Sequence, residues 1–131
     1  MIIDADVFIA GEKGKFDLAG WMESRREEPI QVAAITIAEL WHGVERGTGS
    51  HKISRIEYLS KIIEAVPVLP YTKETSLIHA RLWAELEREG QMIGYYDLIV
   101  AAAALEHGVP IATFNLRHFR LIKGLQVVEP K

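Results

Sequence analysis

The 131-residue sequence contains no cysteine, which excludes disulfide scaffolds, cysteine-ligated zinc or iron–sulfur sites, and thiol catalysis. It also lacks internal repeats and low-complexity tracts, so neither a solenoid nor a disordered chain is expected. No apolar run reaches the roughly 18 residues of a membrane span, because Asp4 and Asp6 interrupt the apolar start of the chain. These absences predict a soluble cytoplasmic protein without a membrane partner.

An excess of positive charge is missing as well. The chain has 15 lysines and arginines against 18 aspartates and glutamates, which gives a net charge of −3. A general nucleic-acid coat protein is usually basic, so this role is disfavoured. Hydrophobic residues make up 49% of the chain, enough at this length for one domain with its own core. We therefore predict a single domain over residues 1–131.

Short strand-like runs alternate with longer segments of helical periodicity. The expected strands cover residues 1–4, 30–35, 67–69, 111–114 and 126–128. The expected helices cover residues 16–27, 36–46, 50–66, 73–89 and 97–107. The last helix is apolar on all sides, which predicts a central, buried position. The alternation predicts an α/β fold in three layers, with about five parallel strands covered by helices on both faces.

This topology would bring several polar residues to one place. In a parallel α/β sheet, the carboxyl ends of the strands and the N-termini of the following helices share one edge, where such folds bind ligands. The polar residues expected at this edge are Asp4, Asp6, Glu39, Asp97, Asn115 and His118. The sequence therefore predicts a cluster of four acids with an amide and an imidazole beside them.

A cluster of acids needs a compensating charge. Two carboxylates about 4 Å apart repel by roughly 4 kcal/mol at an effective dielectric constant of about 20, so the cluster requires a cation or raised pKa values. Oxygen ligands without cysteine favour Mg²⁺ or Mn²⁺. Without the four acids, the chain would have one more basic than acidic residue. A bound cation would therefore leave a surface that no longer repels a polyanion.

Structural explanations remain open for most of these residues. Thr36 and Glu39 have the spacing of a capping box, and Asp97 suits the positive end of a helix dipole. Asp6 is explained equally well as the cap of a turn. Asp4 is harder to explain in this way, because an acid at the buried end of an apolar strand must be paired, hydrogen-bonded or bound to a metal.

A stretch without acids follows the fourth expected strand and carries Arg117, Arg120 and Lys123. Beside an acidic site, such a basic rim would hold phosphates while a metal ion acts. A solvated C-terminal turn explains the same residues equally well. His118 lies in this stretch too, and an ordinary surface position would account for it.

Four segments of the chain, taken in order, resemble the PIN-domain family, and in particular the VapC-type toxins of toxin–antitoxin pairs. They are Ile3–Ile9, Thr36–Leu40, Ile93–Ala102 and Thr113–Phe119. The resemblance covers residues 1–128. It implies a five-stranded parallel sheet, a Mg²⁺- or Mn²⁺-dependent endoribonuclease that hydrolyses RNA phosphodiester bonds, a homodimer, and a small antitoxin partner.

Carried over by position, Asp4, Glu39 and Asp97 match the three main metal-site acids of the family. Two departures stand out: Asp6 occupies a position where many members have asparagine, and Asn115 and His118 occupy the place of a fourth acid. The missing charge predicts one firmly bound cation and a weaker second one. In this mechanism Asp6 or Asn115 orients the attacking water.

The tryptophans add to the expectation of a symmetric dimer, since they are most simply explained as core or interface anchors. They are Trp21, Trp41 and Trp83. Two other functions stay open. A PIN-like module could bind RNA or a protein without turnover. Asp4 and Asp6 also resemble the start of haloacid-dehalogenase-type phosphatases, in which the first aspartate is a nucleophile, although the late acidic pair of that class is missing.

Overall fold

The computed structural model describes all residues 1–131, with five short parallel strands at its centre. The strands are β1 (Ile2–Ile3), β2 (Val32–Ala33), β3 (Val68–Leu69), β4 (Ile111–Ala112) and β5 (Val127–Val128). β4 pairs with both β1 and β5, while β2 pairs with β3. Gln31 joins the two groups through a bridge to Ile2, and its carbonyl accepts the Ile3 N–H at 3.0 Å. The order across the sheet is therefore β3-β2-β1-β4-β5.

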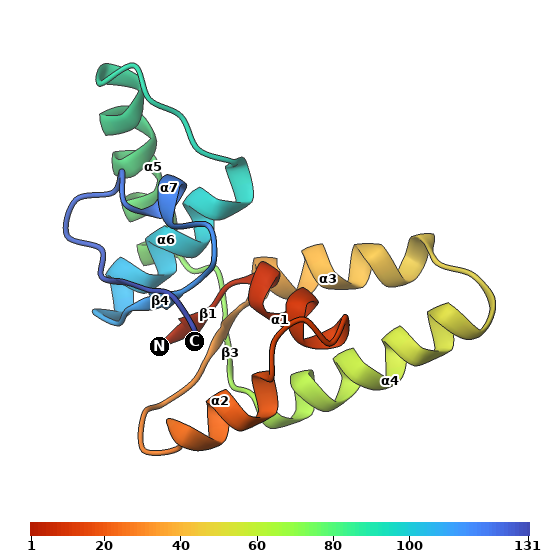
Figure 1. Ribbon diagram of the computed structural model, residues 1–131. Helices are drawn as coiled ribbons and strands as arrows, with labels where there is room; N and C mark the ends of the chain where they lie inside the picture. The colour runs from red at the N-terminus through yellow and green to blue at the C-terminus, as the bar shows by residue number, and fades with distance from the viewer.

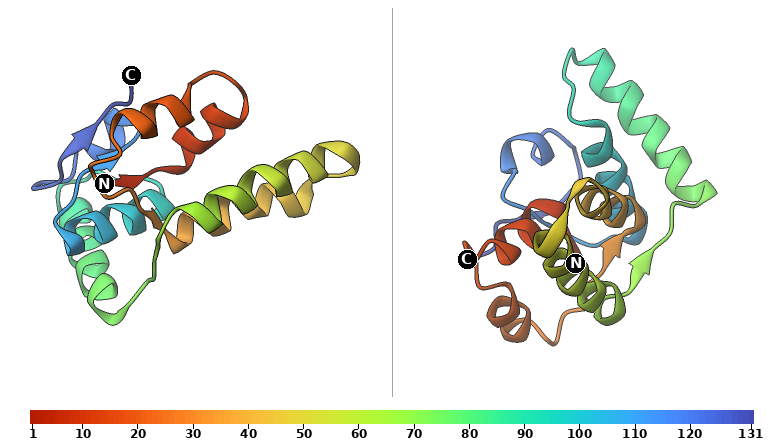
Figure 2. Two further views of the ribbon diagram at one scale, coloured as in Figure 1. Left: turned by 90° about the horizontal axis from the view of Figure 1, so that it is seen from below. Right: turned by 90° about the vertical axis from the view of Figure 1, so that its right-hand side faces the viewer.

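Seven helices connect and follow the strands (Figure 1). They are α1 (Ala5–Glu12), α2 (Leu18–Ser24), α3 (Ala34–Arg46), α4 (Gly49–Ala65), α5 (Lys73–Arg88), α6 (Tyr95–His107) and α7 (Leu116–Phe119). Helices α3 and α4 lie side by side as a long pair that projects from the rest of the molecule (Figure 2). Helix α5 packs along α6, opposite this pair (Figure 1).

Successive strand residues point to opposite faces of the sheet and fill two separate cores. Ile2, Ala33 and Ile111 lie in the core that α5, α6 and α7 cover. Ile3, Val32 and Ala112 lie in the core formed with α1, α2, α3 and α4. The α/β class, the parallel sheet and the helices on both faces are thus as predicted.

Helix α6 is the central helix that its all-round apolar sequence predicts. Its residues from Leu98 to Ala104 are all buried, and Gly108 ends the helix in the left-handed conformation at φ 62°. The helix begins at Tyr95 rather than at Asp97, so Asp97 lies in its first turn. No helix of the structure has the length and hydropathy needed to cross a membrane.

Several predicted boundaries are wrong, and the reasons are local. The expected strand over residues 1–4 stops at Ile3, because Asp4 caps helix α1, which the sequence pattern did not predict. The expected strand over residues 30–35 is only Val32–Ala33, since α3 begins at once with Ala34. In both places the apolar run of the sequence continues past the end of the strand into the following helix, with no intervening loop, so the predicted strand is too long.

The strand order defines where a site can form. From β1 at the centre, the chain first adds β2 and β3 on one side and later β4 and β5 on the other. In open parallel sheets, the point where the order reverses leaves a crevice at the carboxyl ends of the strands. Here this point lies between β1 and β4. Asp4 follows one of these strands and Thr113 follows the other.

Candidate metal centre

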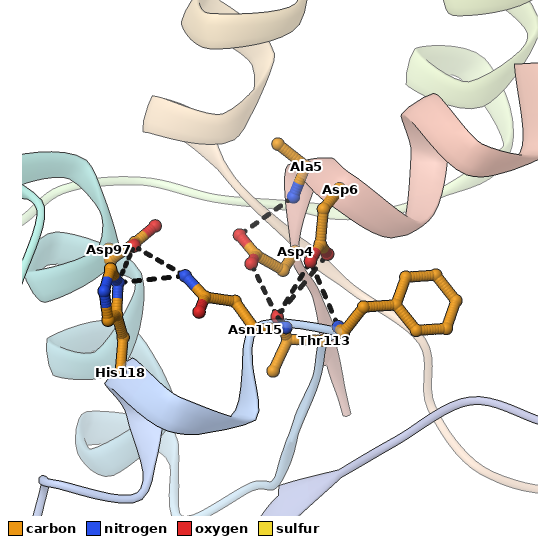
Figure 3. Close-up of polar contacts among 8 residues, drawn as sticks. Asp4, Ala5, Asp6, Asp97, Thr113, Asn115 and His118 are labelled. Carbon is orange, nitrogen blue, oxygen red and sulfur yellow. Dashed lines mark hydrogen bonds and ion pairs between the residues drawn. The ribbon is translucent and has the colours of Figure 1, made fainter.

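Asp4 sits at the carboxyl end of β1 and is only 4% exposed. Its Oδ1 accepts the Ala5 N–H at 2.9 Å, and its Oδ2 accepts the Thr113 hydroxyl at 2.8 Å (Figure 3). Burial first, and then the charge of Asp6, raise the pKa of Asp4 to about 7 in spite of these hydrogen bonds. Asp4 is therefore a buried acid whose ionised form needs a positively charged partner, and no lysine, arginine or histidine of the chain forms an ion pair with it.

Asp6 connects the start of α1 to the segment after β4. Its Oδ2 accepts the Phe114 N–H at 3.1 Å and lies 3.3 Å from the Thr113 hydroxyl oxygen. Burial raises the pKa of Asp6, while these contacts oppose the shift. The explanation of Asp6 as a turn cap is wrong, because Asp4 is the N-cap residue of α1.

Thr113 holds this part of the site together, a role that the sequence alone did not predict. The residue is fully buried, and its hydroxyl oxygen accepts the Asn115 N–H at 2.9 Å. A hydroxyl has one proton to donate. The shorter contact, to Asp4, takes this proton, so the Phe114 N–H is the hydrogen-bond donor that remains for Asp6. The available signal was the position of Thr113 at the start of the fourth PIN-like segment.

Asp97 forms a second group with Asn115 and His118. The Asn115 Nδ2 lies 3.4 Å from Asp97 Oδ2 and 3.0 Å from His118 Nδ1, and His118 Nδ1 lies 3.4 Å from the same Asp97 oxygen. Figure 3 shows the Asn115 amide between Asp97 on α6 and the pair formed by Asp4, which caps α1, and Asp6 in the first turn of α1. The structure therefore brings Asp97, Asn115 and His118 to the same edge as Asp4 and Asp6.

Glu39 has no hydrogen-bond partner for its buried Oε1. Because α3 begins at Ala34, Glu39 lies in the second turn and Thr36 lies inside the helix. Thr36 is fully buried with an unpartnered hydroxyl, so the capping-box explanation is wrong. Burial, followed by the charges of Asp97 and Asp6, raises the pKa of Glu39 to about 7. Glu39 is thus close enough to the other acids to be affected by their charge.

The four acids have no strong positive partner in the chain. None forms an ion pair with a lysine or arginine, and His118 beside Asp97 is the single basic contact. As the side chains stand, no three histidines, aspartates or glutamates form a group that could hold a metal ion. The donors themselves, carboxylates with one amide, are of the type that Mg²⁺ and Mn²⁺ prefer. These donors therefore fit such an ion chemically, and Glu39 supplies a buried carboxylate oxygen, Oε1, that has no hydrogen-bond partner.

The predicted basic rim is divided in the structure. Arg117, Arg120 and Lys123 are all exposed. The Lys123 Nζ lies 3.3 Å from Glu89 Oε1 at the end of α5, which partly offsets its charge. Arg117 lies on α7 next to His118, and neither Arg117 nor Arg120 forms an ion pair. The two arginines are therefore the free cations of this segment.

A parallel three-layer α/β domain with uncompensated acids at its switch point is the architecture of a PIN-type domain. The PIN domain family model matches residues 1–125, and the chain belongs to this family. Ribonuclease VapC1 of Rickettsia felis is 30% identical over 129 residues, covering 98% of this chain and 94% of the relative. The tRNA(fMet)-specific endonuclease VapC of Salmonella typhimurium is 29% identical over 96 residues, covering 73% and 71% of the two chains.

A solved structure gives the same fold. The DNA-bound VapBC of Salmonella typhimurium superposes with a TM-score of 0.88 at 25% sequence identity, covering 98% of this chain and 96% of that one. The PIN-like expectation from the four sequence segments is therefore confirmed. Membership of this family leaves the haloacid-dehalogenase-type interpretation without support.

Proposed function

We propose that this protein is a Mg²⁺- or Mn²⁺-dependent endoribonuclease that hydrolyses RNA phosphodiester bonds, and that it is the toxin of a toxin–antitoxin pair. The observation that carries the proposal is the pair of acids Asp4 and Glu39, both with a pKa of about 7 and without a basic partner, beside Asp97 at the switch point of the sheet. Such a cluster is stable in its ionised form when a divalent cation binds. The ribonuclease and endonuclease names of the relatives support the choice of reaction.

Asp4, Glu39 and Asp97 are the residues that would hold the cation. The bound ion supplies a Lewis acid that polarises the phosphodiester and makes water a stronger acid. Thr113 fixes the orientation of Asp4, and the carboxylate of Asp6 or the amide of Asn115 is placed to orient the attacking water. No side-chain nucleophile is needed.

Arg117 is the cation best placed for the flanking phosphate, because it lies next to His118 on α7 and forms no ion pair. With a cation held at the acids, Arg117 would bind the RNA backbone at the rim of the site. Lys123 contributes less, since Glu89 shares its charge.

The proposal includes a small antitoxin protein and a second copy of the chain as partners. Similarity over almost the whole chain to the VapBC structure from Salmonella typhimurium supports the antitoxin. The expectation of a homodimer comes mainly from the family resemblance, with the tryptophans as a further reason. A PIN-like module that binds RNA without cleaving it is the competing function, and metal-dependent turnover separates the two.

The test uses purified protein, total RNA, and either millimolar Mg²⁺ or Mn²⁺ or a chelator. Wild-type protein should cleave RNA only with metal, and Asp97→Asn should lose cleavage while it remains folded. Asp17→Asn is the matched control, because Asp17 caps α2 outside the site and asparagine caps equally well. Metal should also raise the melting temperature, since an ion that binds only the folded state stabilises it. Undiminished cleavage by folded Asp97→Asn would overturn the proposal.

A further inference from the structure

Five aromatic rings from the β3–α5 segment, α5 and the start of α6 pack against one another. They are Tyr71, His79, Trp83, Tyr95 and Tyr96, called the aromatic platform below. His79 is only 5% exposed and lies behind the others, whereas the remaining four are between 43% and 59% exposed. A cluster of four large half-exposed rings is unusual for a surface that only faces water.

The rings hold each other in fixed positions. His79 is stacked on Trp83 with ring centroids 5.9 Å apart and an interplanar angle of 18°, and Tyr95 meets both rings edge to face. The Tyr71 hydroxyl lies 2.9 Å from His79 Nδ1, which fixes the imidazole. Tyr96 in turn packs edge to face on Tyr95, with centroids 5.8 Å apart. Exposed rings that are already ordered lose little conformational entropy when a planar ligand stacks on them.

The platform and the candidate metal centre share the first turn of α6. Tyr95 and Tyr96 are the first two residues of α6 and immediately precede Asp97. Consecutive Cα atoms are about 3.8 Å apart, so the two tyrosines lie within about two residue lengths of a proposed metal ligand. The first turn of α6 has no side-chain cap. Its free backbone N–H groups therefore favour an anion there, such as a phosphate.

We propose that Trp83, Tyr95 and Tyr96, supported by His79 and Tyr71, form a stacking surface for an unpaired RNA base next to the phosphodiester that is cleaved. The proposal rests on the proposed ribonuclease function and adds to it a base-binding subsite with a preference for single-stranded RNA. Unpaired bases can stack on protein rings, whereas bases in a duplex are already stacked on each other.

A second copy of the chain is the less favoured occupant. A fully buried aromatic ring contributes about 150–250 Å², so four half-exposed rings offer roughly 300–500 Å². A stable interface buries about 800 Å² on each partner, well above this area. The platform by itself is too small for a dimer and large enough for one or two bases.

The experiment measures the binding of a fluorescent single-stranded adenosine octaribonucleotide by anisotropy, in a chelator that prevents metal-dependent cleavage. Tyr95→Leu and Tyr96→Leu should each weaken binding by about 5- to 150-fold, the loss expected for one stacked base. Tyr96→Phe should bind within about twofold of wild type, because it keeps the ring. Ile53→Ala, which changes an exposed apolar side chain on α4, should bind like wild type.

Unchanged affinity of both leucine variants overturns the proposal. Equal wild-type affinity for an octamer RNA duplex overturns it too, as does a change in sedimentation coefficient in the leucine variants, which would assign the rings to an interface between copies. The result is separable from the ribonuclease test. If the leucine variants bind RNA like wild type and wild type still cleaves RNA with Mg²⁺, only the base-stacking proposal is wrong. If RNA affinity depends on the rings but wild type cleaves no RNA, only the proposed nuclease function is wrong.

Discussion

The Thr113 hydroxyl donates to Asp4 Oδ2 at 2.8 Å, although the two residues are 109 positions apart in the chain. Thr113 follows β4 and Asp4 follows β1, so the hydrogen bond spans the two strands on either side of the switch point. Both residues are buried. One hydroxyl therefore sets the orientation of a central acid of the candidate site.

Replacing Thr113 with valine keeps the volume and removes the donor. We expect the pKa of Asp4 to rise further, because the hydrogen bond to Thr113 opposes the effect of burial. Mn²⁺ affinity should fall by about 10- to 100-fold, the usual effect of losing a group that orients a metal ligand. Isothermal titration calorimetry with Mn²⁺ measures the change. Thr113→Ser retains the hydroxyl and should bind almost normally, and an unaltered affinity in Thr113→Val would count against the role of Thr113.

Glu39→Gln should stabilise the metal-free protein at pH 8 and abolish cleavage. The substitution removes a half-buried carboxylate that has an unpartnered oxygen and acidic neighbours. A rise of roughly 4 °C in melting temperature, corresponding to about 1 kcal/mol for a domain of this size, is the expected scale in a chelator. Added Mg²⁺ should then give almost no further rise.

The control for this variant is Glu45→Gln on the same helix. Glu45 accepts the Trp41 Nε1–H at 3.2 Å at an exposed position, so removing its charge should bring no gain in stability. If Glu39→Gln melts lower than wild type in chelator, the view of Glu39 as an uncompensated acid is wrong.

The sequence predicts the fold and the edge of the sheet better than it predicts the contacts at that edge. The alternation of strand-like and helical segments, together with the all-apolar segment 97–107, was enough to predict the three layers of the fold. The position of Glu39 relative to the start of α3 depends on the chain turning helical at Ala34, and no capping residue marks that point. The role of Thr113 depends on β1 and β4 being neighbours, which a single sequence does not reveal. The exposure of Trp83, explained from sequence as a core or interface anchor, depends on how α5 packs on α6.

In a chelator, stability should fall as the pH rises from 6 to 8. The pKa values of Asp4 and Glu39 are about 7 in the folded protein, against ordinary values of 3.8 and 4.5. Between these limits the folded state binds more protons than the unfolded state, so the free energy of unfolding decreases with rising pH. Burial lowers the pKa of His79 from its ordinary value of 6.5, so this residue acts in the opposite direction up to about pH 6.5, in the lowest part of the same pH range.

The measurement is the melting temperature at half-unit steps of pH in wild type and in an Asp4→Asn, Glu39→Gln double variant. The slope should be clearly smaller in the double variant. With Mg²⁺ present the sign reverses for wild type, because protons compete with the ion for the same two carboxylates below pH 7. A metal-free wild type that grows more stable between pH 6 and 8 would contradict the raised pKa values.

Asn115→Asp should make the stability of the protein more dependent on bound metal and should increase the number of metal ions that the site binds. The Asn115 amide lies 3.4 Å from Asp97 Oδ2 and offers it a hydrogen-bond donor, and a carboxylate in its place would repel Asp97 instead. In a chelator the variant should therefore melt several degrees below wild type. With Mn²⁺ the added oxygen ligand should compensate and raise the binding stoichiometry toward two ions, since we expect the neutral amide at this position to weaken the binding of a second ion. Asn115→Ala separates the two effects, because it removes the donor without adding charge. If Asn115→Asp melts no lower than Asn115→Ala in chelator and titrates with a single Mn²⁺, then Asn115 does not occupy the position of a fourth metal-site acid.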